Sequence, residues 1–154
     1  MRVYISGPLQ GSTDLRLARA LYEAVAEIVT TLDLDPYVPH MHTDPERAQF
    51  VSASEVYRRD VRELLNSDLV IAHVGAPSTG VGAELAIAAH AGVPIVAIVR
   101  SGEKVSRFAA GLIEDAGGTI VQFGGIADLK DALSRNLMNT RARSVVPSHS
   151  RLVG

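Results

Sequence analysis

The chain has 154 residues, of which 47% are hydrophobic and 21% are charged, and its formal net charge is −2. This length and composition are typical of one globular domain with a substantial core. The slightly negative charge argues against a nucleic-acid partner. Because the chain has no cysteine, disulfides and thiolate metal sites are excluded.

The N-terminus and the apolar runs predict a cytoplasmic protein without membrane association. Met1 leads directly into an apolar segment, without the basic region or cleavage site of a signal peptide. The most apolar stretch, residues 69–99, is interrupted by glycine, proline, histidine and Glu84, so it is not expected to span a membrane.

Apolar runs alternate with amphipathic segments along the chain. Strands are expected at residues 3–6, 35–38, 69–74, 94–99 and 119–123, and helices at 14–31, 51–66, 79–91, 104–116 and 126–137. Residues 39–49 are expected to form a polar loop. Residues 139–154 contain arginine and serine without periodicity, so a mobile tail is expected after a domain of residues 1–138.

This alternation predicts an α/β protein with a single Rossmann-like (flavodoxin-like) domain. Its five-stranded, mainly parallel sheet would be flanked by helices on both faces. Continuous apolar strands such as LVIAHV and PIVAIV fit a sheet that is covered on both sides. In such sheets ligands bind at the carboxyl ends of the strands, beside the point where the strand order reverses.

Glu84 is the only formally charged residue between Asp68 and Arg100. Burying a carboxylate without a partner costs roughly several kcal/mol, so such a residue is usually paired or functional. A structural role, with Glu84 bonded to nearby backbone or to an arginine, is the alternative to catalysis.

Glu84 closes a glycine-rich turn, Pro77-Ser78-Thr79-Gly80-Val81-Gly82-Ala83-Glu84, between a strand and a helix. Backbone N–H groups and the helix dipole at such a turn make an anion site, although Ser78 or Thr79 is also simply a good helix N-cap. Glu84 follows Ser78 by six residues, about 9 Å along a helix, which matches the reach from a nucleotide 5′-phosphate to its anomeric carbon. The helix N-terminus is expected to favour the ionised carboxylate.

Two other segments place polar groups near strand ends. Tyr4 begins the run Tyr4-Ile5-Ser6-Gly7-Pro8-Leu9-Gln10-Gly11, in which the glycines allow close approach of a ligand, though Tyr4 could simply be a core aromatic residue. Asp60 lies at the edge of the apolar stripe of the second helix. It either pairs with a neighbouring arginine or faces a cleft, where Asp60 and Glu84 would form an acid and nucleophile pair for a glycosidic bond.

The histidines give weaker signals. His40 and His42, with Asp44 and Glu46, match no metal-site spacing, and loop polarity explains them; His40 could still line a pocket. His73 and His90, which close a strand and a helix, are expected to be structural. We therefore expect neither a metal nor a cofactor.

Together these motifs resemble the nucleoside 2-deoxyribosyltransferase superfamily, and most closely its branch of 2′-deoxynucleoside 5′-phosphate N-hydrolases and CMP N-glycosidases. The similarity spans about residues 2–138. The residues that carry it are Tyr4-Ile5-Ser6-Gly7, Asp60-Val61 with Leu64, residues 67–72, the block from Pro77 to Leu85, and Arg100-Ser101-Gly102 with Ser106.

The resemblance implies that residues 1–138 are a catalytic domain that hydrolyses a (deoxy)ribonucleoside 5′-monophosphate. Glu84 would attack the anomeric carbon, Tyr4 would orient Glu84, and Asp60 would assist the leaving base. Ser78 would bind the 5′-phosphate, and Ser106 would reach the phosphate from the neighbouring subunit of a homodimer. The remaining implied contacts are Gly7, Leu9 and Gly80 at the sugar and His40 at the base.

The chain also departs from this branch, because Pro8 and Gln10 stand where its hydrolases have a small polar residue and an arginine. Base or phosphate selectivity can therefore differ. Two other functions remain open: a deoxyribosyltransferase that exchanges bases, and a non-catalytic nucleotide-binding module.

Overall fold

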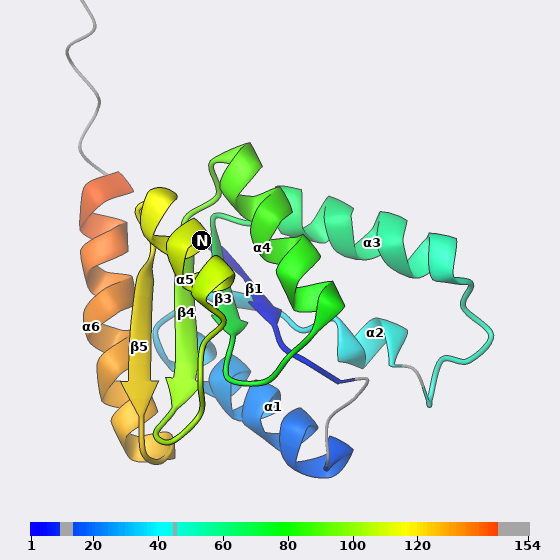
Figure 1. Ribbon diagram of the computed structural model, residues 1–154, viewed down its shortest axis with the longest axis horizontal. Helices are drawn as coiled ribbons and strands as arrows, with labels where there is room; N and C mark the ends of the chain where they lie inside the picture. Colours follow the sequence, from blue (N-terminus) through cyan, green and yellow to red (C-terminus); the bar gives the residue numbers. More distant parts are fainter. Residues whose placement is uncertain (10–13, 45, 145–154) are drawn as a thin grey trace, which may run out of the picture.

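The strands form one five-stranded sheet in which every neighbouring pair is parallel. The computed structural model describes residues 1–9, 14–44 and 46–144, with residues 139–144 described by their backbone alone. The strands are β1 (Arg2–Ser6), β2 (Asp35–Tyr37), β3 (Leu69–His73), β4 (Ile95–Arg100) and β5 (Thr119–Phe123), in the order β2-β1-β3-β4-β5 (Figure 1). The predicted flavodoxin-like fold is confirmed.

Helices cover both faces of this sheet (Figure 1). They are α1 (Leu15–Thr31), α2 (His40–Thr43), α3 (Ala53–Leu65), α4 (Thr79–Ala91), α5 (Arg107–Asp115) and α6 (Ile126–Ser144). Buried residues of α1 and α6 form one apolar cluster with one face of the sheet, whereas those of α3, α4 and α5 form a second cluster with the other face. No helix in the described part of the chain is long and apolar enough to cross a membrane.

The alternation of side chains along β1 decides which residues reach which layer. Val3 and Ile5 belong to the cluster beneath α1 and α6, whereas Tyr4 belongs to the cluster beneath α3 and α4. Because successive side chains of a strand point to opposite faces, Ser6 shares the face of Tyr4. The Gly-rich segment after β3 leads into α4 on that same face, so β1 and α4 bring their polar groups together.

The strand order reverses between β1 and β3, which lie side by side in the middle of the sheet. From β1 the chain crosses through α1 to β2 at one edge, and after β3 it continues through β4 to β5 at the other edge. The loops that leave β1 and β3 therefore diverge, and they open a crevice at the carboxyl end of the sheet.

Several predicted boundaries were wrong. The expected loop of residues 39–49 contains the short helix α2, which Pro39 precedes with helical backbone angles that its ring favours. The expected helix of residues 104–116 begins only at Arg107. The expected helix of residues 126–137 continues as α6 to Ser144, since the sequence has no glycine or proline before that point.

The expected tail of residues 139–154 therefore begins inside α6, and residues 145–154 lie outside the described part. Gly92 forms the C-cap of α4, with a φ of 71° in the left-handed region that glycine adopts readily.

Candidate active site

A cleft of about 690 Å³ lies at the carboxyl ends of β1 and β3, between α2, α3 and α4. A cleft of this size accommodates a small-molecule ligand. Its lining residues include most of the predicted site residues, namely Gly7, Leu9, His40, Asp60, Ser78, Gly80 and Glu84. The sheet and the helix ends thus bring together residues that lie far apart in the sequence.

Glu84, on the second turn of α4, receives a hydrogen bond on each carboxylate oxygen. The Tyr4 hydroxyl donates to Oε1 at 2.6 Å, and the Ser6 hydroxyl donates to Oε2 at 2.5 Å. Tyr4 and Ser6 are both almost completely buried, with exposed fractions of 0% and 1%. Two fixed donors from one strand therefore define the orientation of the Glu84 carboxylate.

These donors oppose the electrostatic effect of burial. Burial raises the pKa of Glu84, whereas the hydrogen bonds from Ser6 and Tyr4 favour its ionised form. Burial and the negative charge of Glu84 also raise the pKa of Tyr4 far above its ordinary range, so Tyr4 stays protonated and remains a donor. Glu84 lies on the second turn of α4, whereas a helix dipole acts mainly within the first turn.

Asp60, on α3, faces the same cleft and has no ion pair with the arginines beside it among the described residues. Its oxygens instead accept long hydrogen bonds of 3.4 Å from the hydroxyls of Tyr37 and Thr43. Burial, followed by the negative charge of Glu84, raises the pKa of Asp60 to about 6. Asp60 can therefore hold a proton under conditions in which an exposed aspartate is ionised.

Aromatic rings pack behind the two carboxylates. The ring of Tyr37 lies between those of Tyr4 and His42, with centroid distances of 5.6 Å and 5.0 Å and stacked geometry. Since the Tyr4 hydroxyl bonds Glu84 and the Tyr37 hydroxyl bonds Asp60, this stack fixes the two donors relative to each other.

Ser78 occupies the N-cap of α4, and its hydroxyl oxygen accepts a hydrogen bond of 3.3 Å from the backbone N–H of Val81. The simple capping function that the sequence allowed is therefore present. Ser78, Thr79 and Gly80 also line the cleft, so the N-terminus of α4 is open to it. A cleft wall made of a helix N-terminus suits an anionic group such as phosphate.

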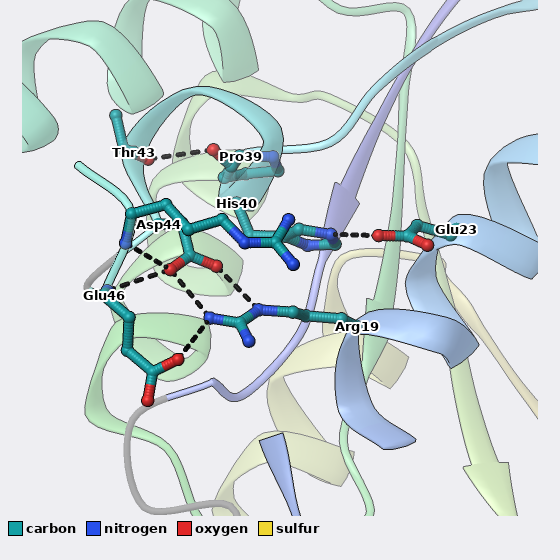
Figure 2. Close-up of polar contacts among 8 residues, drawn as sticks. Arg19, Glu23, Pro39, His40, Thr43, Asp44 and Glu46 are labelled. Carbon is teal, nitrogen blue, oxygen red and sulfur yellow. Dashed lines mark hydrogen bonds and ion pairs between the residues drawn. The ribbon is translucent and has the colours of Figure 1, made fainter. Parts of the chain in front are cut away.

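Two side chains of α1, Arg19 and Glu23, hold the wall that contains His40 (Figure 2). Arg19 makes hydrogen bonds of 2.7 and 2.8 Å with the Asp44 carboxylate and one of 2.9 Å with Glu46. One helical turn further, Glu23 lies 3.2 Å from Nε2 of the buried His40. Although burial opposes ionisation, the Arg19 guanidinium and two backbone N–H groups lower the pKa of Asp44 to about 2.

Ser106 does not line this cleft, and it lies exposed at the N-cap of α5. Its predicted contact belongs to a neighbouring subunit and stays a prediction. The described residues contain no group of three or more histidine, aspartate or glutamate side chains that could hold a metal ion.

Sequence reasoning missed the direct contacts of Ser6, Tyr37 and Thr43 with the two carboxylates. Ser6 was part of a recognised motif, and its position two residues after Tyr4 on a strand places both on one face. Tyr37 and Thr43 gave no comparable signal, because only the packing of β2 and α2 beside α3 brings them to Asp60.

The raised pKa of Asp60 predicts that ionisation of this residue lowers the free energy of unfolding. Because the folded pKa of about 6 exceeds the unfolded value of 3.8, wild-type stability falls as pH rises from about 4 to about 6. Asp60→Asn has no carboxyl group to ionise and lacks this loss. The Tm of the variant relative to that of the wild type should therefore be higher at pH 7 than at pH 4. Partial solvent exposure reduces the effect, and we expect a gain of about 2–4 °C. Thermal unfolding at both pH values measures it, and an equal Tm difference at both would contradict the environment assigned to Asp60.

Comparison with known proteins identifies relatives of the whole domain. The family model described as nucleoside 2-deoxyribosyltransferase matches residues 3–138. A protein of Methanosarcina barkeri named "Putative 2'-deoxynucleoside 5'-phosphate N-hydrolase 1" is 30% identical over 116 residues, which cover 71% of this chain and 69% of that protein. A protein of Syntrophotalea carbinolica with the same name is 25% identical, and the match covers 91% of this chain and 96% of its relative.

Solved structures show the same fold. The solution structure of BlsM has a TM-score of 0.72 at 20% identity and covers 97% of this chain and 96% of its own. The structure of the Clostridium botulinum CMP N-glycosidase BcmB has a TM-score of 0.67 at 16% identity, with 88% and 99% covered. The match of the family model to nearly the whole described chain agrees with the resemblance of the motifs. The chain belongs to the nucleoside 2-deoxyribosyltransferase family.

Proposed function

We propose that this protein is a nucleotide N-glycosidase, which hydrolyses the N-glycosidic bond of a (deoxy)ribonucleoside 5′-monophosphate to free base and sugar 5-phosphate. The observation that carries the proposal is the pair of carboxylates in one cleft. Glu84 is held between two hydroxyl donors, and Asp60 has a pKa of about 6. The names of its relatives support nucleotides as the substrate class.

In the first step an oxygen of Glu84 attacks the anomeric carbon while the bond from this carbon to the base nitrogen breaks. The products of this step are a glycosyl ester on Glu84 and the free base. Tyr4 and Ser6 keep the carboxylate in one orientation, which limits the entropy lost on reaching the transition state. Covalent catalysis of this kind divides one difficult displacement into two easier ones.

Asp60 supplies the proton that the leaving base requires. Its raised pKa keeps a fraction of Asp60 protonated near neutral pH, and the Asp60 carboxylate formed in this step then accepts a proton from water. The resulting hydroxide attacks the anomeric carbon of the ester and releases Glu84 and the sugar 5-phosphate. At the end of the cycle Glu84 is again ionised and Asp60 is again protonated.

The remaining wall of the cleft matches the parts of a nucleotide. Ser78 and the N-terminus of α4 would bind the 5′-phosphate, while Gly7, Leu9 and Gly80 would contact the sugar. His40 would lie on the base side. In a homodimer, Ser106 of the partner subunit would complete the phosphate site.

A second candidate function is base exchange, which the family model itself describes. A transferase would form the same ester on Glu84 and pass the sugar to a second base instead of water. The helix N-terminus in the cleft favours the hydrolase, because it suits a phosphorylated substrate.

The proposal predicts release of free base from nucleoside 5′-monophosphates without any acceptor. Chromatography of reactions with ribo- and deoxyribonucleotides and their nucleosides, with and without an acceptor base, measures this directly. Turnover only with an acceptor would identify a transferase. Binding without cleavage of any compound would identify a nucleotide-binding module.

Glu84→Ala should abolish base release while the protein still folds and binds nucleotide, because it removes the attacking oxygen. Single-turnover kinetics and calorimetric binding measure the two properties separately. Glu114→Ala is a suitable control, since Glu114 is an exposed residue near the end of α5 and does not line the cleft. Normal turnover by Glu84→Ala would rule out the proposed nucleophile.

Asp60→Asn should lower kcat by about 10²–10⁴-fold, the usual contribution of a general acid. In the wild type, kcat/KM should decline as pH rises above about 6, because the protonated form of Asp60 is lost. The variant should lose this part of the pH profile. An unchanged profile in Asp60→Asn would assign the titration to another group.

Ser78→Ala should raise KM for nucleotides by about tenfold and leave KM for nucleosides nearly unchanged, because only nucleotides would lose the charge-assisted hydrogen bond of the hydroxyl. Ser106→Ala should have the same selectivity if the partner subunit completes the phosphate site. Equal changes for nucleotides and nucleosides would argue against phosphate recognition by these serines.

A further inference from the structure

Three buried or partly buried polar side chains lie on the opposite face of β1 and β3 from the two carboxylates. Tyr22 comes from α1, His73 ends β3, and Glu103 belongs to the connection between β4 and α5. The exposed fractions of Tyr22 and His73 are 2% and 7%. None of the three lines the cleft, so the proposed reaction assigns them no direct task.

These side chains form a continuous chain of hydrogen bonds that ends on the backbone of the cleft wall. Glu103 Oε2 lies 2.9 Å from Nε2 of His73, and Nδ1 of His73 lies 3.3 Å from the Tyr22 hydroxyl. The Tyr22 hydroxyl donates to the carbonyl oxygen of Pro8 at 2.9 Å. Pro8 stands between Gly7 and Leu9, which both line the cleft.

Glycine at two strand ends makes room for this chain. A Cβ atom on Gly7 would lie 2.1 Å from Cζ of Tyr22, and a Cβ atom on Gly75 would lie 1.8 Å from Oε2 of Glu103. Any larger residue at either position would displace the side chain beneath it. The loops after β1 and β3 are therefore built directly on Tyr22 and Glu103.

The number of protons restricts how this chain can be bonded. Tyr22 has one hydroxyl proton, which cannot serve Pro8 and His73 at the same time. Burial, followed by the charge of Glu103, raises the pKa of Tyr22, so this proton is retained. When this proton is donated to Pro8, the contact between Tyr22 and His73 is a hydrogen bond only if Nδ1 of His73 donates to the Tyr22 oxygen.

The charged groups around His73 fit this arrangement. The Glu103 carboxylate accepts from His73 and also from the backbone N–H of Arg100 at 2.8 Å, and these contacts lower its pKa although burial opposes ionisation. Beyond Tyr22 lies the ring of His40, at a centroid distance of 6.1 Å. Glu103 and Tyr22 thus contact the two ring nitrogens of His73 and hold the ring between them.

We propose that Tyr22, His73 and Glu103 are positioning residues that fix the Gly7–Leu9 backbone as the sugar-side wall of the cleft. The proposal rests on the proposed function for its kinetic consequence but not for its structural one. Glu103 orients the His73 ring, His73 contacts the Tyr22 hydroxyl, and Tyr22 anchors Pro8. Tyr22, which lies on the other face of β1, thereby keeps the Gly7–Leu9 wall at a fixed distance from Glu84 across the cleft.

Tyr22→Phe tests this assignment, because it removes the hydroxyl group and keeps the ring. NMR relaxation should show the order parameters of the Gly7 and Leu9 amides falling from about 0.85, typical of rigid backbone, toward about 0.6. KM for the nucleotide should rise about three- to tenfold, as expected for one lost hydrogen bond, with kcat changed by less than about twofold. Glu103→Gln should change both quantities in the same direction but less.

Ile28→Val is the matched control, because Ile28 is a buried residue of the same helix and does not line the cleft. It should lower Tm without changing the order parameters or KM. Unchanged order parameters and KM in Tyr22→Phe would overturn the proposal, and so would equal changes in Ile28→Val. If the wild type released no base, the proposed function would fail, while the order parameters would still decide whether Tyr22 anchors the loop.

Discussion

The site depends on one constraint, which is that a carboxylate in an almost entirely apolar segment must be given donors when it is buried. Glu84 receives one donor on each oxygen, and both come from β1. Burial alone would favour the neutral acid, which is a poor nucleophile. The hydroxyls of Tyr4 and Ser6 oppose this effect without adding a counter-charge, so the carboxylate can remain both ionised and reactive.

The second carboxylate has a different environment in the same cleft. Among the described residues, Asp60 has only two long hydrogen bonds, and burial followed by the charge of Glu84 raises its pKa. The result is one acid with strong donors and one with weak donors, which fits the tasks of nucleophile and proton donor that we propose for them. The ring stack of Tyr4 and Tyr37 couples the two environments mechanically, because each hydroxyl serves one carboxylate.

The features that could be predicted from the sequence are those that local patterns determine, namely the helices, the strands and the two carboxylates. Hydrophobic periodicity predicted the parallel sheet and its helices, and the isolated charge of Glu84 and the marginal position of Asp60 indicated both carboxylates. Several contacts between distant segments were missed, because no local pattern encodes them. Thr43 reaches Asp60 only through α2, a helix too short to give a periodic signal, and Arg19 reaches Asp44 only when α1 packs beside that segment.

Strand β1 connects the groups on the two faces of the sheet, because its residues contact Glu84 on one face and the loop that follows it contacts Tyr22 on the other. Its pairing with β3 places Tyr4 opposite Val70 and Ser6 opposite Ala72, so both donors face α4. Immediately after the strand, Gly7 and Pro8 rest on Tyr22 from the other face. A shift of one residue in the register of β1 would exchange these faces, remove both donors from Glu84 and separate Gly7 and Pro8 from Tyr22. The apolar alternation of Val3 and Ile5, which opposes such a shift, therefore maintains the donors of Glu84 as well as the core.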